Sequence, residues 1–281
     1  MNDYIGKKYM NMSELFNRHF TRIPLGWFTS GPNGASRAER MISRFLRSRW
    51  SKPLIGWHVW RHKVQISRKQ LRNYKTFRDF FARDCAAVCI DSTPEHLISP
   101  CDGWLRACPI DADGGFSVKG ERYGVQGIFD DPQLTALYNG GLCLVFRFAP
   151  SDCHRFCYVD DAYLWENHYI PETPCDNRSN RPFHMNNRRS WCLMATRSFG
   201  PVVQVEIGTH ALGGIVNNRE SGRVWRGDEK GHFELAGSSI VLLFEPGLIQ
   251  PISYIQRASE KGREVRVRRG MWIGTKRDQQ A

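Results

Sequence analysis

Residues 230–246 read KGHFELAGSSIVLLFEP, which combines a short turn with an apolar run. Glycine tolerates backbone angles that other residues avoid, and serine hydroxyls bond to nearby backbone groups. Gly237, Ser238 and Ser239 therefore predict a sharp turn, and the Ile, Val, Leu and Phe residues after it predict a buried strand. On its own such a turn is ordinary, so its meaning depends on the rest of the chain.

Other segments after Asp84 have the same β-rich character. Each is a short run of alternating or continuous apolar residues bounded by Gly, Pro, Asn or Asp. They are GLCLVFRFAP (141–150), GPVVQVEIGTHALGGI (200–215) and GREVRVRRGMWIGT (262–275). The chain lacks the strand–helix alternation that builds a parallel sheet. We therefore predict an α+β protein whose catalytic body, residues 81–281, consists of packed antiparallel sheets.

The first 80 residues differ from this body in charge. They contain 17 lysine and arginine residues against four aspartate and glutamate residues, whereas the remainder has 23 against 24. A basic segment attracts a polyanion, which is either nucleic acid or an anionic membrane surface. Because no known nucleic-acid motif accompanies the basic residues, we do not expect nucleic-acid binding.

Residues 36–50, SRAERMISRFLRSRW, predict a basic amphipathic helix in this segment. Ser36 and Glu39 have the spacing of a capping box. Apolar residues then recur at helical spacing, with arginines beside them: Met41, Ile42, Phe45, Leu46 and Trp50. This pattern is typical of an interfacial helix, although a basic helix packed on the protein's own core fits it equally. We assign residues 1–80 to basic helices that associate with a membrane.

The composition is that of a globular protein, with 41% hydrophobic and 12% aromatic residues. No run of 18 apolar residues predicts a membrane-spanning helix, and the charged first thirty residues do not resemble a signal peptide. Nine scattered cysteines without an export signal predict reduced thiols in a cytosolic setting. Cys153-His154-x-x-Cys157 lacks the second ligand pair that a zinc site needs, so we expect no metal.

Four short motifs contain serine, aspartate, histidine or cysteine side chains of the kinds that act in catalysis. They are Ser99-Pro100-Cys101-Asp102-Gly103, Pro150-Ser151-Asp152-Cys153-His154-Arg155, residues 205–215 and the turn at 230–239. In this order, over residues 74–273, they resemble the phosphatidylserine decarboxylase family. Further segments that match the family are Phe77-Arg78-Asp79-Phe80-Phe81-Ala82-Arg83, Val118-Lys119-Gly120 and Asn187-Arg188-Arg189-Ser190-Trp191.

The resemblance implies a chain that cuts itself between Gly237 and Ser238. The Ser238 hydroxyl would attack the Gly237 carbonyl and convert the amide to an ester. Elimination and hydrolysis would then leave a pyruvoyl group, and a large chain (1–237) would stay associated with a small chain (238–281). The pyruvoyl ketone, derived from Ser238, would form a Schiff base with the substrate amine and act as the electron sink for loss of CO₂.

The resemblance also assigns the site residues. Ser238 is the nucleophile and Asp102 is the orienting carboxylate of a Ser-His-Asp arrangement. Asp152 and His154 belong to a motif whose first histidine is associated with decarboxylation. The family's second histidine, three residues later and associated with self-cleavage, is replaced here by Cys157.

Cys157 leaves the base for self-cleavage open. Only a thiolate could accept the serine proton, and a free thiol has a pKa near ~8.5. Either Arg155 or His154 could lower that pKa, or a histidine elsewhere, His210 or His232, could be the base. Loss of one triad member slows such chemistry by orders of magnitude, but self-cleavage is needed only once per molecule.

The function implied by the resemblance is conversion of phosphatidylserine to phosphatidylethanolamine. Two alternatives stay open: a decarboxylase of another amino acid, and an uncleaved homologue with a binding role, which Cys157 favours. Because phosphatidylserine lies in a membrane, we expect a peripheral protein on the cytoplasmic side of the cell membrane, bound to anionic phospholipid. The sequence leaves a homodimer open.

Overall fold

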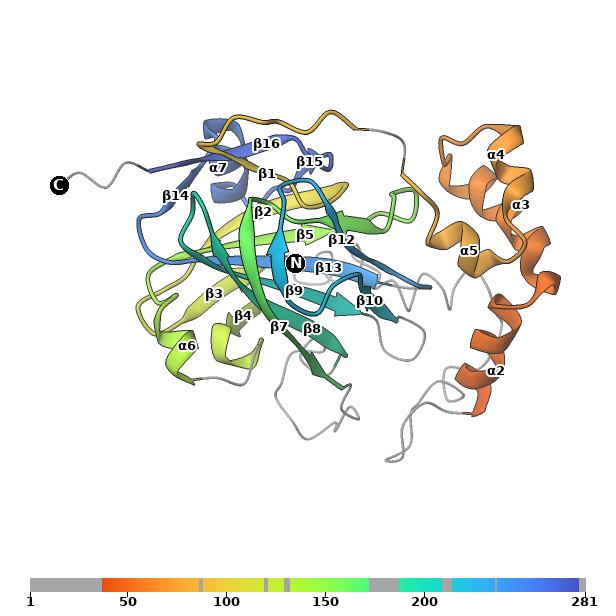
Figure 1. The fold of residues 1–281 in the computed structure, drawn as a ribbon, viewed down its shortest axis with the longest axis horizontal. Coiled ribbons are helices and arrows are strands. Elements are labelled where there is room, and N and C mark those ends of the chain that lie inside the picture. Colours follow the sequence, from red (N-terminus) through yellow and green to blue (C-terminus); the bar gives the residue numbers. More distant parts are fainter. Residues whose placement is uncertain are drawn as a thin grey trace, which may run out of the picture.

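The computed structural model describes residues 37–85, 88–118, 121–128, 132–171, 187–208, 214–235 and 237–277 (Figure 1). The helices are α2 (Arg37–Leu46), η2 (Arg49–Ser51), α3 (Lys52–His62), α4 (Arg68–Asn73), α5 (Phe77–Phe81), η3 (Val125–Gly127), α6 (Pro132–Ala136) and α7 (Ser253–Glu260). The strands are β1 (His96–Ile98), β2 (Gly103–Pro109), β3 (Gly115–Val118), β4 (Glu121–Gly124), β5 (Leu142–Arg147), β6 (Arg155–Cys157), β7 (Ala162–Ile170), β8 (Arg189–Thr196), β9 (Pro201–Gly208), β10 (Ile215–Asn217), β11 (Gly222–Val224), β12 (Glu229–Phe233), β13 (Gly237–Phe244), β14 (Ile249–Pro251), β15 (Val265–Val267) and β16 (Trp272–Lys276).

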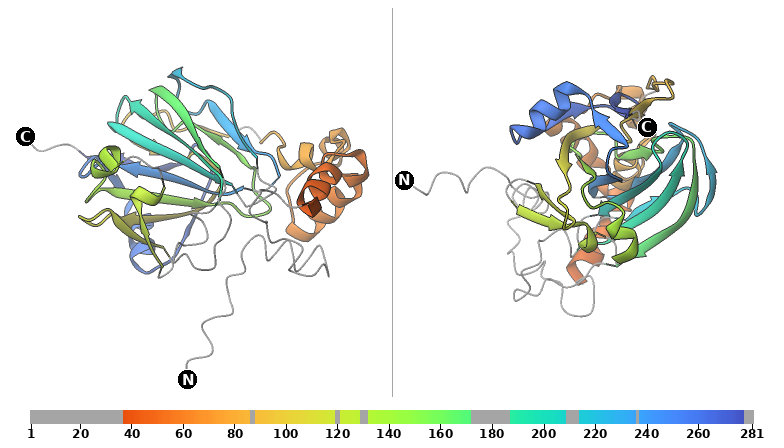
Figure 2. Two further views of the ribbon diagram at one scale, coloured as in Figure 1. Left: turned by 90° about the horizontal axis from the view of Figure 1, so that it is seen from below. Right: turned by 90° about the vertical axis from the view of Figure 1, so that its left-hand side faces the viewer.

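The strands pair antiparallel throughout the described residues. The largest sheet is curved and has eight strands in the order β11-β7-β8-β9-β13-β5-β2-β15 (Figure 2). Smaller sheets have the orders β1-β16-β14, β10-β12-β6 and β3-β4. The predicted α+β fold, a β-dominated body of antiparallel sheets preceded by helices, is confirmed.

Strand β13 lies in the middle of the largest sheet and is buried on both faces. Its side chains at 240, 242 and 244 belong to the larger hydrophobic cluster, whereas Val241 and Leu243 belong to a second cluster. Successive side chains of a strand point to opposite faces, so a strand covered on both sides must be apolar throughout. This is why residues 240–244 form a continuous apolar run rather than an alternating one.

The predicted N-terminal helix is present but shorter than expected. It ends at Leu46 and is followed by the 3-10 turn η2, so residues 47–50 are not part of α2. Ser36 lies outside the described residues, and the capping box that it would form with Glu39 stays a prediction.

The apolar residues of α2 serve two surfaces. Leu46 is buried in the main core and Ile42 packs against it. By contrast, Met41 and Phe45 are 68% and 43% exposed, and Trp50 of the following η2 is 84% exposed. One side of the helix therefore covers the protein's own core, whereas the other presents apolar groups to solvent, and its contact with a membrane stays a prediction. No helix in the described residues has the length and hydropathy needed to cross a bilayer.

Helices α2–α5 lie together at one end of the β-body (Figures 1 and 2). Ile55 of α3 and three phenylalanines of α5 join Leu46 in the same hydrophobic cluster as the body strands. The Ser51 hydroxyl accepts a hydrogen bond of 2.8 Å from the backbone N–H of Phe77. The boundary predicted between residues 80 and 81 thus falls inside α5, and the helices and the body share one core.

Cys85 and Cys153 form a disulfide, with their Cα atoms 5.6 Å apart. The prediction of reduced thiols is therefore wrong for this pair. The fold brings the segment after α5 against the loop before β6, within the distance that a disulfide spans. The two cysteines are 68 residues apart in the sequence, so no local pattern indicated this contact. Among the other described cysteines, Cys89 is an exposed thiol and the rest are buried thiols: Cys101, Cys108, Cys143, Cys157 and Cys192.

Candidate active site

Three of the four motifs identified in the sequence lie at one edge of the large sheet. Trp104 of β2 pairs with Arg147 of β5, and Arg147 pairs in turn with Ser239 of β13. Asp102 precedes β2, the loop that carries His154 follows β5, and Gly237 begins β13. Because antiparallel neighbours start and end at the same edges, these three motifs meet although they are far apart in the chain.

The predicted cleavage junction lies at an irregularity in the sheet. Gly237 pairs with Gly208 of β9 and Ser239 pairs with Ile207, so the register shifts at Ser238. A bulge of this kind leaves one residue outside the regular ladder and bends the strand. The structure describes the backbone of Ser238, and its side chain lies outside the described part. His210, which follows β9, also lies outside it.

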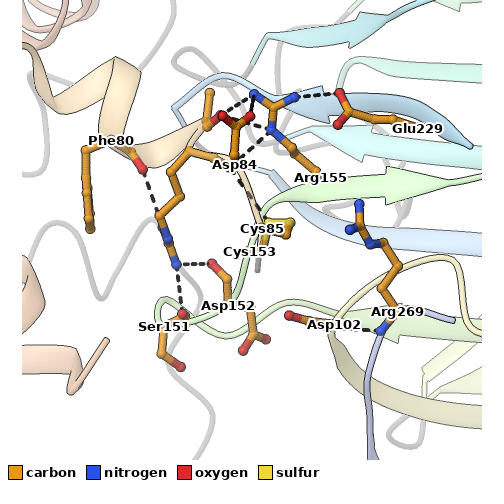
Figure 3. Close-up of a disulfide and its surroundings, with 12 residues drawn as sticks. Phe80, Asp84, Cys85, Asp102, Ser151, Asp152, Cys153, Arg155, Glu229 and Arg269 are labelled. Carbon is orange, nitrogen blue, oxygen red and sulfur yellow. Dashed lines mark hydrogen bonds and ion pairs between the residues drawn. A yellow bond between two sulfur atoms is a disulfide. The ribbon is translucent and has the colours of Figure 1, made fainter. Parts of the chain in front are cut away.

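Asp102 lies in a turn that is held from several sides. The Ser99 hydroxyl donates to the Cys101 carbonyl over 2.8 Å, and the Asp102 carboxylate accepts 2.9 Å from the backbone N–H of Arg269 (Figure 3). A Cβ at Gly103 would come within 2.8 Å of the Arg147 carbonyl oxygen, so this position accommodates only glycine without a shift. The turn therefore presents a partly exposed, oriented carboxylate at the sheet edge.

Cys157 lies against the same turn. Its backbone N–H donates to the Pro100 carbonyl over 2.8 Å, and its Sγ lies 3.8 Å from the Ser99 carbonyl oxygen. The side chain is fully buried. Burial raises the pKa of this thiol to about 12, and the charge of Arg269 offsets only part of the effect.

Of the alternatives that the sequence left open for Cys157, the structure does not support a lowering of its pKa by Arg155 or His154. Arg155 points toward Asp84 and Glu229, with nitrogen–oxygen distances of 2.9 and 2.6 Å (Figure 3). His154 is itself uncharged, because burial holds its pKa well below the ordinary value. Cys157 therefore occupies the position of the family's second histidine as a protonated thiol.

His154 is enclosed by aromatic rings. The Phe81 ring lies 4.0 Å from the imidazole between centroids, and the Phe148 ring stacks on it at 5.3 Å with planes 15° apart. The residue is fully buried. Burial, followed by the positive charge of Arg83, lowers the pKa of His154, so the imidazole is present in the neutral form that accepts a proton.

Asp152 is committed to an ion pair. Its carboxylate accepts two hydrogen bonds from Arg266, one of them 2.8 Å long, and a third of 2.7 Å from the backbone N–H of Ala149. Only 3% of the residue is exposed. These contacts give Asp152 the role of fixing the loop that leads to His154, with its charge neutralised by Arg266.

His232 is the described histidine on the strand that leads into the cleavage turn. It belongs to β12 and pairs with Arg155 of β6. Burial and the charge of Arg155 lower the pKa of His232, which keeps this imidazole neutral as well. The backbone N–H of Phe233 donates to the His154 carbonyl over 3.0 Å, so β12 and the His154 loop are directly joined.

A cleft of about 560 Å³ lies away from this edge. Its lining includes Pro109, Leu142 and Glu245. Pro109 and Leu142 are paired at the far ends of β2 and β5, and Glu245 follows the last residue of β13. The cleft is therefore at the opposite edge of the sheet and takes no part in the candidate site.

The sequence did not indicate the arginines that organise the site. Arg266 and Arg269 lie in the stretch 262–275, which was interpreted only as a strand. The alternation of Val265, Arg266 and Val267 was the available signal, because the two valines are buried and the arginine between them must point elsewhere.

Comparison with known proteins identifies one family. The sequence profile of the phosphatidylserine decarboxylase family matches residues 77–274. The chain is 35% identical over 249 residues to a phosphatidylserine decarboxylase proenzyme of Clostridium beijerinckii, covering 85% of this chain and 84% of that one. It is 32% identical over 289 residues to phosphatidylserine decarboxylase proenzyme 2 of Clostridium acetobutylicum, covering 98% and 96%. A proenzyme of the same description in Desulfitobacterium hafniense is 29% identical over 274 residues, covering 89% and 91%.

These similarities define the chain as an enzyme of the carboxy-lyase class. The chain belongs to the phosphatidylserine decarboxylase family. The relatives are described as proenzymes, a term for precursors that are processed.

Proposed function

We propose that the chain cleaves itself between Gly237 and Ser238 and then, with a pyruvoyl group derived from Ser238, converts phosphatidylserine to phosphatidylethanolamine. The observation that carries this proposal is the convergence of three motifs at one sheet edge. Asp102, the His154 loop and the irregular start of β13 are aligned there by the pairing of Trp104, Arg147 and Ser239. Family membership supports the same reaction.

The irregular register at Ser238 suits the self-cleavage step. The Ser238 hydroxyl adds to the Gly237 carbonyl, and the amide becomes an ester with a free Ser238 amine. β-Elimination releases the Gly237 carboxylate and leaves dehydroalanine, which takes up water and loses ammonia to give the pyruvoyl ketone. A residue outside the regular ladder has the freedom that this rearrangement of its backbone needs.

The base for this step is better supplied by a histidine than by Cys157. Burial raises the pKa of this thiol to about 12, so the group is protonated at neutral pH. His232 is neutral and lies on β12, five residues before Gly237. Its position supports it as the proton acceptor, and His210 is the second candidate.

Residues of this chain fit the finished cofactor. The pyruvoyl ketone supplies an electron sink for decarboxylation of an amine substrate. The neutral His154 imidazole can hold or move a proton in that step, and the Phe81 and Phe148 rings exclude water from it.

The sheet order supports association of the two chains after cleavage. The small chain, residues 238–281, would supply the middle strand β13, which pairs on one side with β9 and on the other with β5. It would also supply β15, which pairs with β2, and β16, which pairs with β1. Separating the chains would expose both faces of β13, so cleavage leaves one folded unit.

The exposed apolar residues of the helices support peripheral binding to anionic phospholipid. Met41, Phe45, Trp50 and Trp60 are exposed, and exposed arginines accompany them. Aromatic side chains insert at the headgroup level while arginines attract an anionic surface. We propose that this binding takes place on the cytoplasmic side of the cell membrane.

Point variants test the membrane proposal better than removal of the N-terminal helices. Removing the helices would also remove Leu46 and Ile55, which belong to the hydrophobic core. Trp50→Ser with Trp60→Ser should reduce flotation with phosphatidylserine vesicles severalfold. Tyr254→Ser, which alters a residue 66% exposed on α7, is the matched control. Equal flotation of the double variant and the control would contradict peripheral binding through these helices.

The substrate is tested by release of CO₂ from two carboxyl-labelled compounds, phosphatidylserine in mixed vesicles and free serine. We expect release from the lipid alone, and loss of release after borohydride reduces the ketone. Release from free serine only would favour a decarboxylase of another amino acid. A folded, uncleaved chain that releases CO₂ from neither compound would favour the alternative of an uncleaved homologue with a binding role.

A further inference from the structure

In the segment Phe77-Arg78-Asp79-Phe80-Phe81-Ala82-Arg83, only Phe81 has a role in the proposed reaction so far, yet other residues of the segment also reach the site. Phe81 covers one face of the His154 imidazole with the ring centroids 4.0 Å apart. Two residues later, Arg83 is buried, with 7% of its surface exposed. A charged side chain is buried at high cost unless its donors are satisfied, so its partners indicate what it does.

The partners of Arg83 are carbonyls of the loop that carries His154. Its Nη2 donates to the carbonyl oxygen of Ser151 over 2.9 Å and to that of Asp152 over 2.6 Å. The guanidinium also lies over the Phe80 ring, 4.9 Å from its centroid. One planar group thus fixes the two backbone carbonyls that lie two and three residues before His154.

The loop returns contacts to the same segment. Arg155 donates from Nε to the carbonyl oxygens of Ala82 and Arg83 over 3.2 and 3.1 Å. Beside these hydrogen bonds, the disulfide from Cys85 to Cys153 links the segment after α5 covalently to the loop that carries His154 (Figure 3). Both sides of His154 in the sequence are therefore attached to the segment that ends α5.

Arg83 also affects the protonation of His154 through its charge. The buried guanidinium disfavours a second positive charge nearby and lowers the pKa of His154, after burial the largest cause. His58 adds a smaller effect of the same sign, and the backbone of Asp152 opposes both. Arg83 thus contributes both to where the imidazole lies and to its remaining neutral.

We propose that Arg83 is a positioning residue for decarboxylation: by holding the Ser151 and Asp152 carbonyls, it keeps a neutral His154 between Phe81 and Phe148. The inference rests on the proposed function, in which His154 handles a proton at the substrate. Arg83 itself acts through His154 and the loop. Its donors to Ser151 and Asp152 are already engaged and it is nearly buried, which disfavours a direct contact with substrate phosphate.

The test compares Arg83→Gln and Arg83→Lys with Arg257→Gln in the full-length protein. Arg257 is an exposed arginine of α7 whose Nε bonds within its own helix, so it controls for loss of one positive charge. Kinetics on phosphatidylserine vesicles are expressed per processed chain, measured by intact mass. The His154 pKa is measured separately by NMR titration in the uncleaved Ser238→Ala protein, with and without Arg83→Gln.

We expect Arg83→Gln to lower kcat at least ~10-fold with KM within about twofold, since small misplacements of a catalytic group are costly. It should also raise the pKa of His154. Arg83→Lys keeps the charge but loses the planar guanidinium, in which Nη2 donates to both loop carbonyls while Nη1 donates to the Phe80 carbonyl oxygen. It should therefore leave the pKa of His154 low and lower kcat severalfold. Arg257→Gln should match the wild type.

Three results would overturn the inference: an unchanged kcat in both variants, a raised KM at unchanged kcat, or a His154 pKa that does not respond to Arg83→Gln. If Arg83→Gln does not fold, kcat of Arg83→Lys decides. An inactive wild type would count against the proposed function alone, because the titration in the Ser238→Ala background needs no turnover.

Discussion

His154 and Cys157 are three residues apart and equally buried, yet burial has opposite consequences for them. Burial disfavours the charged form of any group. For His154 the form that remains is the neutral imidazole, which is the proton acceptor. For Cys157 the form that remains is the thiol, whose pKa rises to about 12 and which accepts no proton at neutral pH.

The comparison shows why replacing a histidine with a cysteine at position 157 removes a proton acceptor, although both side chains can be buried there. The site keeps a functional group at His154 and loses one at Cys157. In the proposed reaction, self-cleavage would then use a base from another element, whereas decarboxylation would keep His154. The two halves of the proposed reaction can thus be separated by mutation.

The largest effect is expected at the nucleophile. Ser238→Ala removes the attacking hydroxyl and should abolish cleavage, whereas Ser239→Ala should still cleave, because Ser239 pairs regularly with Ile207 and Arg147 in the sheet. Denaturing gels and intact mass after long incubation measure both. Cleavage of the Ser238→Ala protein, or an intact Ser239→Ala protein, would assign the wrong serine.

His154→Gln should be processed normally but should lower kcat about 100-fold, the usual contribution of a general acid–base group. The low pKa of His154 also predicts that wild-type kcat is retained as pH falls through the range where a free histidine gains its proton. The control is His96→Gln, which changes an imidazole paired with Asp91. Failure of the His154→Gln protein to cleave would instead make His154 the processing base.

At position 157, Cys157→Ala should cleave at the wild-type rate, because a buried thiol contributes no thiolate. Cys157→His places an imidazole against the Asp102 turn and should speed cleavage about tenfold, within the range of general base catalysis. Time courses of chain separation on gels compare the two. A strong loss of cleavage in Cys157→Ala would show that the thiol acts after all.

The disulfide should have the smallest effect on the reaction. Arg83 and Arg155 hold the His154 loop independently, so Cys85→Ser should change kcat less than about threefold. Closing 68 residues of chain should stabilise the fold by about 4 kcal/mol in the chain-entropy account. Urea unfolding with and without reductant measures this, with Cys89→Ser as the free-thiol control. Equal stability of both variants would contradict a bond present in solution.

Much of the fold could be predicted because its signals are local. The apolar run of β13 and the turn residues before it are adjacent in the sequence, and the order of the motifs led to the family. The alignment of Asp102 with Gly237 could be expected only through that family, since strand register is a property of the folded sheet.

The features that the sequence could not supply depend on distant neighbours. The pairing of Cys85 with Cys153 and the protonation of Cys157 both follow from packing of the α5 segment and the Ser99 turn. The buried ion pair of Lys230 and Glu206, 3.0 Å apart and fully enclosed, is a further case. Charged residues are expected at the surface unless paired, and no local pattern identifies a partner 24 residues away.

The most direct test of the central claim is the intact mass of the purified wild-type protein under denaturing conditions. We expect two chains, residues 1–237 and the 44 residues 238–281, with the smaller beginning in a pyruvoyl group in place of Ser238. A single chain of 32.5 kDa after long incubation would contradict self-cleavage.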